Sequence, residues 1–214
     1  MPLTKIKSLG ITDGTIVNAD INASAAIDAT KLSGISSDYV LLATTDASSS
    51  ASISFDGYFS STYKNYHVIF SDVYPSTSAT LSVRLRRSNA DVTASSYEFA
   101  SRRTYKASGA TDANDGRYNY NTSSLDVLTN SSPNSASRTT SGIITIYNPL
   151  STTSYKKING NAVGASDDAG GTNSLWNVSF ASQLYDNTNA LSGITFYYTS
   201  GNITSGTFKL YGIK

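Results

Sequence analysis

Beyond Tyr39, apolar and polar residues alternate at every second position in one short segment after another. In the segment 79–86, for example, polar residues separate Leu81, Val83 and Leu85. A period of two places successive side chains on opposite faces, and it therefore predicts a strand with one buried face. The same period recurs in three further apolar sets: Tyr66, Val68 and Phe70; Trp176, Val178 and Phe180; Ile194, Phe196 and Tyr198.

The residue types agree with an all-β chain. A long helix needs unbranched polar side chains on its surface, yet the sequence has a single glutamate (Glu98), a single glutamine (Gln183) and a single methionine, against 15 tyrosines. Strands are predicted at residues 39–43, 52–56, 65–73, 79–86, 96–105, 141–147, 154–163, 174–182, 193–199 and 205–213. Residues 46–50 are predicted as a turn. This spacing predicts an antiparallel β-sandwich of the jelly-roll kind over residues 36–214.

Two polar stretches interrupt the alternation, at residues 107–138 and 164–174, and both are predicted as long loops. The first contains Arg117, Tyr118 and Tyr120 within the run Arg-Tyr-Asn-Tyr-Asn. Tyrosine among Asn, Ser and Gly is typical of adaptable recognition surfaces, and flat aromatic faces stack on sugar rings. These three residues are therefore the candidate binding residues, with carbohydrate as the ligand class.

The first 35 residues follow a different pattern. Their large apolar residues recur in steps of about five, which matches neither a helix nor a strand. The set comprises Ile11, Ile16, Ile21, Ile27 and Leu32. A chain of this kind cannot bury enough apolar surface by itself. It is either a disordered leader or an extended arm whose aliphatic residues are buried against sister chains or another protein. The regular spacing favours the arm.

Several kinds of chemistry are excluded or disfavoured by the residue types. The chain has no cysteine and one histidine, so it cannot form a disulfide or a thiolate metal site, and a multi-histidine metal site cannot form within one chain. No metal and no cofactor is expected. The net charge of +1 provides no general attraction to nucleic acid. No apolar run approaches the 18 residues of a membrane span, and the amino end lacks the apolar core of a signal peptide.

The remaining candidate sites have structural alternatives. The segment 112–116 has an acidic pattern like a calcium loop, but its second aspartate comes one residue early and no glutamate follows. Asp167 and Asp168 are adjacent, so in a strand they would point to opposite faces. His67 is expected to be structural or to lie at an interface. Five arginines would form a basic patch if their two strands were neighbours: Arg84, Arg86, Arg87, Arg102 and Arg103. Alternatively, they contact another protein, or acids such as Asp72 and Glu98 neutralise a solvated face.

The stretch from Ile11 to Leu32 resembles the repeated leader of bacteriophage tail-fibre and related virion proteins. Residues 63–73, 81–85 and 205–214 resemble the sandwich domain at the end of such fibres. The resemblance implies a homotrimer that is made in the host cytoplasm and displayed on the virion surface. Residues 1–35 would attach it to other virion proteins, and residues 36–214 would form the exposed head.

The leader is short compared with the long repetitive shaft of typical fibres, which leaves more than one role open. The first is recognition of host-surface carbohydrate, in which multivalency strengthens weak contacts. The second is capsid decoration, in which the arm and the arginine face bridge capsid subunits. The third is a surface-polysaccharide hydrolase or esterase, for which the sequence has no nucleophile motif such as Gly-x-Ser-x-Gly. A non-enzymatic role is therefore expected.

Overall fold

The structure is a computed structural model that describes Ile21 and residues 37–105, 113–128, 131–166 and 174–214. The chain divides into two units, Met1–Ser37 and Asp38–Lys214. Four of the predicted arm residues lie outside the described residues: Ile11, Ile16, Ile27 and Leu32. Ile21 is described, and its side chain is 39% exposed. Burial of the arm against other chains stays a prediction.

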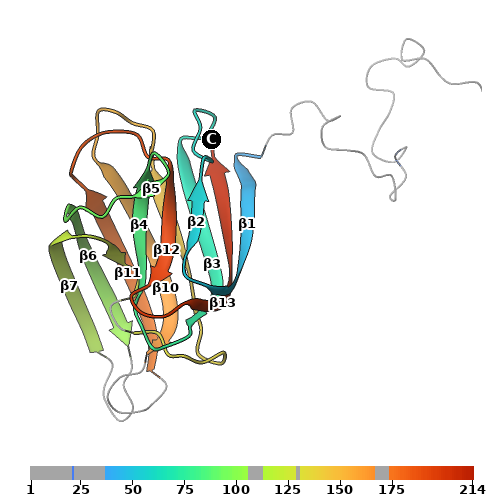
Figure 1. The fold of residues 1–214 in the computed structure, drawn as a ribbon, viewed down its shortest axis with the longest axis vertical. Helices are drawn as coiled ribbons and strands as arrows, with labels where there is room; N and C mark the ends of the chain where they lie inside the picture. The colour runs from blue at the N-terminus through green and yellow to red at the C-terminus, as the bar shows by residue number, and fades with distance from the viewer. Residues whose placement is uncertain (1–20, 22–36, 106–112, 129–130, 167–173) are drawn as a thin grey trace, which may run out of the picture. The chain divides into compact units, whose positions relative to one another are not determined.

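The described residues form 13 strands in two antiparallel sheets, and none of them is in a helix (Figure 1). The larger sheet has the order β1 (Tyr39–Ser50), β13 (Ile203–Ile213), β3 (Asn65–Pro75), β9 (Thr140–Tyr147), β10 (Lys156–Ser166), β11 (Ser174–Leu184), β6 (Tyr97–Tyr105), β7 (Ala113–Thr122). The smaller sheet has the order β2 (Ile53–Asp56), β12 (Gly193–Tyr198), β4 (Leu81–Arg87), β5 (Ala90–Asp91), and β8 (Leu125–Asp126) also pairs with β4. The predicted antiparallel β-sandwich is confirmed. Within the described part of the chain, no helix is long and apolar enough to cross a membrane.

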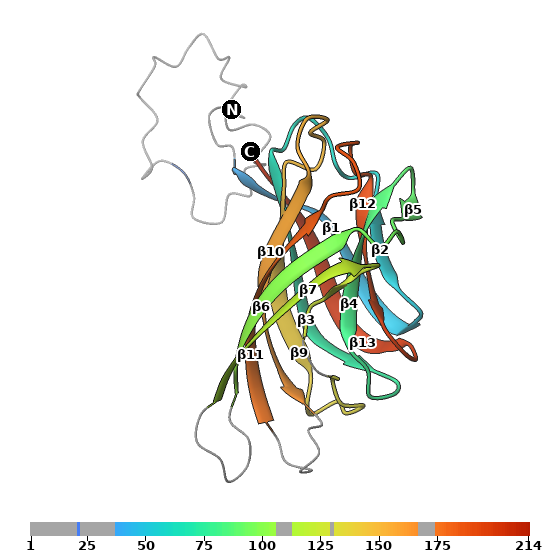
Figure 2. The same ribbon diagram turned by 90° about the vertical axis from the view of Figure 1, so that its left-hand side faces the viewer.

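Eight of the strands follow the jelly-roll order. Successive strands β1, β2, β3 and β4 alternate between the two sheets, as the chain then does again through β8, β9, β12 and β13. The resulting spatial orders β1-β13-β3-β9 and β2-β12-β4-β8 are those of two interleaved Greek keys. Two additional hairpins, β6–β7 and β10–β11, pair with each other through β11 and β6. They extend the larger sheet beyond β9 (Figure 2).

The core lies between the two sheets and contains the apolar sets that the alternation predicts. Phe70 and Phe208 of the larger sheet meet Phe196 of the smaller sheet, and all three rings are fully buried. The Phe196 centroid lies 5.1 Å from that of Phe208 and 5.8 Å from that of Phe70. Both contacts are tilted, and aromatic rings prefer such arrangements to face-to-face stacking. The inward-facing residues of the predicted strands are thus confirmed.

Three sequence-based boundaries are wrong. Residues 107–138 are not one long loop, because they contain β7 and β8, and the predicted loop 164–174 overlaps the ends of β10 and β11. The predicted turn at 46–50 continues β1, which pairs with β13 as far as Ser50. Strand β7 is a sheet edge rich in Asn, Asp and Gly, residues that are depleted in strands. Its strand conformation comes from main-chain pairing with β6, which no local apolar pattern indicates.

Gly160 offers a steric test of the packing on the inner face of the larger sheet. A Cβ atom at this position would lie 2.6 Å from Cζ of Phe180 and 2.3 Å from the Ile143 carbonyl oxygen. Gly160→Ala is therefore expected to lower the free energy of unfolding by about 1–3 kcal/mol, because the ring and a backbone strand must move. Gly116→Ala is the control, since its nearest atom would be 3.8 Å away. Equal unfolding midpoints in guanidinium for the two variants would contradict the steric explanation.

Candidate functional site

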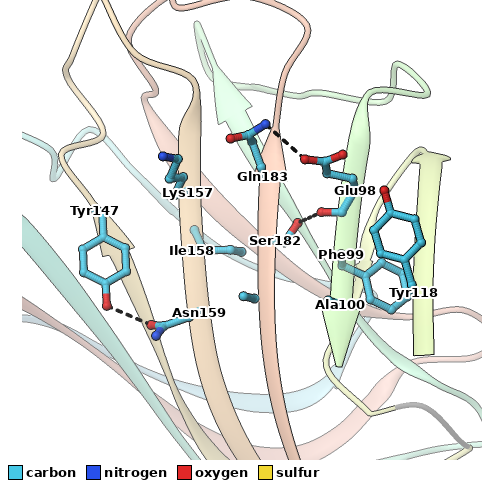
Figure 3. A pocket seen from close by; sticks show the side chains of 11 residues that line it. Glu98, Phe99, Ala100, Tyr118, Tyr147, Lys157, Ile158, Asn159, Ser182 and Gln183 are labelled. Carbon is cyan, nitrogen blue, oxygen red and sulfur yellow. Dashed lines mark hydrogen bonds between the residues drawn. The ribbon is translucent and has the colours of Figure 1, made fainter. Parts of the chain in front are cut away.

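A groove of about 390 Å³ lies on the outer face of the larger sheet, over the two additional hairpins (Figure 3). Alternation of exposed and buried residues along β10, β11 and β6 identifies this outer face. Strand register places side chains in rows across it. One row runs from Tyr147 through Lys157 and Gln183 to Glu98. The next row contains Asn159, Ala181, Ala100 and Tyr118.

Small side chains form the floor of the groove. Ala181 and Ala100 are direct cross-strand partners on β11 and β6, and methyl groups there leave space that larger side chains would fill. Tyr118 stands at one end, with 66% of its side chain exposed, and Tyr147 stands at the other, 42% exposed. An apolar floor between two exposed aromatic rings suits a flat ligand with both apolar and polar faces.

The polar side chains of the groove are held in place by neighbours. The Tyr147 hydroxyl donates to Asn159 Oδ1 at 3.1 Å, and Gln183 Nε2 donates to Glu98 Oε1 at 3.1 Å (Figure 3). Each of these bonds joins residues on neighbouring strands and restricts their rotamers. The groove therefore presents oriented amide, carboxylate and hydroxyl groups, which are suited to recognition of sugar hydroxyls.

The structure separates the three predicted binding residues. Tyr118 and Tyr120 are both exposed on β7, and their ring centroids lie 6.0 Å apart. Tyr118 lines the groove, whereas Tyr120 does not. Arg117 is paired with inward-facing Ser101, so it lies on the opposite face of β7 from the two tyrosines. There it borders a second cavity together with Asp126.

Arg117 acts on the electrostatics of this second cavity. Burial raises the pKa of the Asp126 carboxyl, while the Ser82 hydroxyl and the charge of Arg117 oppose that rise. The Ser82 hydroxyl donates to Asp126 Oδ1 at 2.7 Å. Arg117 thus has a local electrostatic role beside Asp126 rather than a place in the groove.

Sequence reasoning missed most of the groove. The strands β9, β10 and β11 were predicted, but the residues that they contribute to the groove had no distinguishing pattern: Tyr147, Lys157, Asn159 and Gln183. Ala100 and Ala181 are 81 positions apart, so only strand register makes them neighbours. The alternation places each of these residues on the outer face, but it contains no signal for a groove.

The five arginines do not form one basic patch, because the two strands that carry them are not neighbours. Strands β4 and β6 belong to different sheets. Arg102 is exposed on the outer face of the larger sheet, while Arg103 is buried on its inner face. The Arg103 guanidinium lies 4.3 Å from the ring centroid of Trp176 and 4.8 Å from that of Tyr105, which is typical of cation–π contacts.

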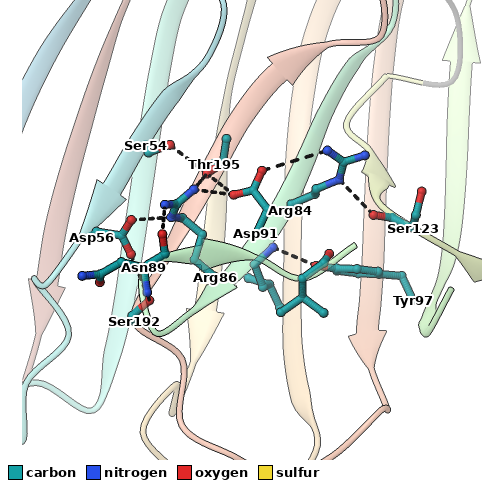
Figure 4. A network of polar contacts seen from close by, with 12 residues as sticks. Ser54, Asp56, Arg84, Arg86, Asn89, Asp91, Tyr97, Ser123, Ser192 and Thr195 are labelled. Carbon is teal, nitrogen blue, oxygen red and sulfur yellow. Dashed lines mark hydrogen bonds and ion pairs between the residues drawn. The ribbon is translucent and has the colours of Figure 1, made fainter. Parts of the chain in front are cut away.

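The arginines of β4 are paired with acids of the same head, and Figure 4 shows Arg84 and Arg86. Arg86 forms ion pairs with Asp56 and Asp91 and donates to Thr195 Oγ1 at 2.9 Å. Arg87 pairs with Asp186.

Arg84 shares Asp91 at 4.0 Å and lies 4.5 Å from the ring centroid of Tyr197. The acids predicted for this role, Asp72 and Glu98, instead accept hydrogen bonds from Thr139 and Gln183. The arginines of β4 therefore hold the smaller sheet together and do not present an unneutralised basic face.

His67 lies in an aromatic cluster at the other end of the larger sheet. Its Nδ1 is 3.4 Å from the Tyr39 hydroxyl, and the Tyr39 ring stacks on Tyr211 with centroids 4.5 Å apart. Burial lowers the pKa of His67. Because the folded state then favours the neutral ring, this group makes the fold less stable as the pH falls through and below 6.5.

The acidic sequence candidates are not placed by the structure. Asp112, Asp167 and Asp168 lie outside the described residues, and the calcium-like pattern at 112–116 is described only from residue 113 onward. Among the residues that are described, no group of three or more histidine, aspartate or glutamate side chains could hold a metal ion.

Comparison with known proteins found no relative: no family model, curated protein or solved structure matches the chain.

Proposed function

We propose that the chain is a non-enzymatic bacteriophage virion surface protein that binds host-surface carbohydrate through the groove of its larger sheet. The observation that carries the proposal is the alanine floor between the exposed rings of Tyr118 and Tyr147. A sugar ring has an apolar face that can stack on an aromatic ring and hydroxyl groups at its edge that can bond Asn159 and Glu98. The resemblance of residues 11–32 to fibre leaders supports the virion location.

The proposed arrangement is a homotrimer that is attached through residues 1–35 and displays its sandwich heads outward. A single open groove makes few contacts, so each head would bind weakly. Three linked heads, repeated over many copies, convert weak contacts into useful avidity. Apart from Tyr147 on β9, the residues that line the groove lie on the hairpins added to the jelly roll, so most of them can vary while the eight jelly-roll strands keep their core.

The charges in the groove support binding rather than cleavage. Glycoside hydrolysis generally needs two carboxyl groups, about 5 to 9.5 Å apart, on either side of one bond. Among the described residues that line the groove, Glu98 is the one carboxylate, and Gln183 occupies one of its oxygens. Capsid decoration through an arginine face is not favoured, because Arg86 and Arg87 pair with acids of the same chain.

Tyr118→Ala is expected to reduce the affinity for bacterial surface polysaccharide about tenfold per site, which is the loss of one aromatic stacking contact. The measurement is binding of the biotinylated full chain, multimerised on streptavidin, to an array of such polysaccharides. Tyr155→Ala is the matched control, since Tyr155 is 48% exposed and does not line the groove. If Tyr118→Ala bound as well as the control, the groove would not be the binding site.

A further inference from the structure

Two cations beside the groove have no acidic partner among the described residues. Lys157 lines it in the row of Tyr147, and Arg102 lies on β6 two positions beyond Ala100 of the floor. Both side chains are exposed, and neither forms an ion pair or side-chain hydrogen bond with the described residues. This contrasts with the smaller sheet, where Arg86 is paired with two aspartates.

The nearby anion does not neutralise Lys157. Strand register places Gln183 between Lys157 and Glu98, so their Cα atoms are separated by two inter-strand spacings, about 10 Å. Glu98 accepts a hydrogen bond from Gln183 instead. With Arg102 included, the residues described around the groove comprise two cations and one carboxylate, an excess of positive charge.

We infer that the groove selects an acidic glycan, with a carboxylate of the ligand on Lys157 and a sugar ring on Tyr118. The inference rests on the proposed function and adds the ligand's chemical class. Lys157 is three strands away from Tyr118, about 14 Å across the sheet, so the ligand must contain several linked sugars. An ammonium and a carboxylate form a charge-assisted hydrogen bond, which is stronger than a bond between neutral groups.

A glycan fits this face better than a denser polyanion. The net charge of the face around the groove is small, and two cations cannot match the closely spaced phosphates of a nucleic acid. The exposed rings and the alanine floor require apolar surface on the ligand, which sugar rings provide between their acidic groups.

The test compares each bacterial polysaccharide that binds with the same polysaccharide after its carboxyl groups have been reduced to hydroxymethyl groups by carbodiimide and borohydride. The biotinylated full chain on streptavidin is the probe. Reduction is expected to weaken binding by wild type about tenfold, which is the loss of a partly screened charge-assisted bond. Lys157→Gln is expected to bind the native and the reduced polysaccharide with equal affinity. That affinity is expected to match the affinity of wild type for the reduced polysaccharide.

Lys209→Gln is the matched control, because it removes the same charge from the outer face of the same sheet, on β13 and away from the groove. It is expected to keep the tenfold preference for the native form. If wild type bound native and reduced forms equally while Tyr118→Ala lost binding, the acidic-glycan inference would be wrong and the proposed function would stand. If no polysaccharide bound the multimerised chain, both would be wrong.

Discussion

Lys156→Met is expected to lower the free energy of unfolding by about 3–5 kcal/mol, a large part of the stability of a typical domain. Lys156 is 1% exposed, and its Nζ donates to the carbonyls of Ser151, Ser154 and Thr188 at 2.5, 3.0 and 2.9 Å. Three acceptors require the three protons of an ammonium group. Methionine fills a similar volume but leaves the three carbonyl oxygens without this donor.

The cost arises because two connecting segments depend on one side chain. Ser151 and Ser154 precede β10, whereas Thr188 lies between β11 and β12, so the ammonium joins both ends of the β10–β11 hairpin to each other. Burial lowers the pKa of Lys156, and the charge of Arg87 acts in the same direction. The three carbonyl dipoles offset this cost of burying the cation. Removal of the cation leaves the same three buried carbonyls without their donor, which lowers the stability.

The neighbouring lysine provides the control. Lys157→Met makes the same chemical change one residue later, on the exposed face of β10, and is expected to change the unfolding free energy by no more than about 0.5 kcal/mol. The measurement is guanidinium unfolding of the full chain at one fixed protein concentration, since association would otherwise shift the midpoint. Changes of equal size in the two variants would show that the carbonyl contacts of Lys156 contribute no stability.

Phe196→Ala is expected to have an effect of similar size, about 3–5 kcal/mol, for a different reason. Phe196 is fully buried between the sheets, and its ring contacts Phe70 and Phe208 of the opposite sheet. Truncation removes the transfer free energy of the ring and leaves a cavity that two separately held sheets cannot close completely.

Phe196→Leu is the matched variant for this position. It keeps most of the buried volume and is expected to cost less than about 1.5 kcal/mol. Unfolding of both variants, followed by tryptophan fluorescence of Trp176 and by circular dichroism, gives the two free energies. If alanine cost no more than leucine, the Phe70–Phe196–Phe208 contact would not be a principal connection between the sheets.

From the sequence, the residues that face the core were predicted more accurately than the ends of the strands. Periods of two identified the inward faces of β3, β4, β11 and β12, because a half-buried strand must alternate apolar and polar residues. The same argument missed β7, because polar residues such as Arg117 and Asn119 occupy its inward positions and leave no apolar alternation. It also missed the continuation of β1 through residues 46–50, where small polar residues resemble a turn.

The candidate site depended more strongly on the tertiary structure. Tyr118 was identified from its residue type and polar surroundings, and it does line the groove, but Tyr120 does not and Arg117 faces away. The aromatic residue at the opposite end of the groove, Tyr147, was predicted only as the end of a strand. Its role depends on the pairing of β9, β10, β11, β6 and β7.

By itself the sequence determined the fold class and the inward faces of β3, β4, β11 and β12, because alternation is a local property of each segment. Only the tertiary structure decided which strands became neighbours, since pairing between segments as distant as β6 and β11 depends on the whole arrangement of both sheets. That pairing brings Ala100 to Ala181, and within the described part of the chain it places Gln183 between Lys157 and Glu98. The tertiary structure also places Lys156 and Lys157 in different environments. The Lys156 side chain contacts carbonyl oxygens inside the head, whereas the Lys157 side chain is exposed to solvent.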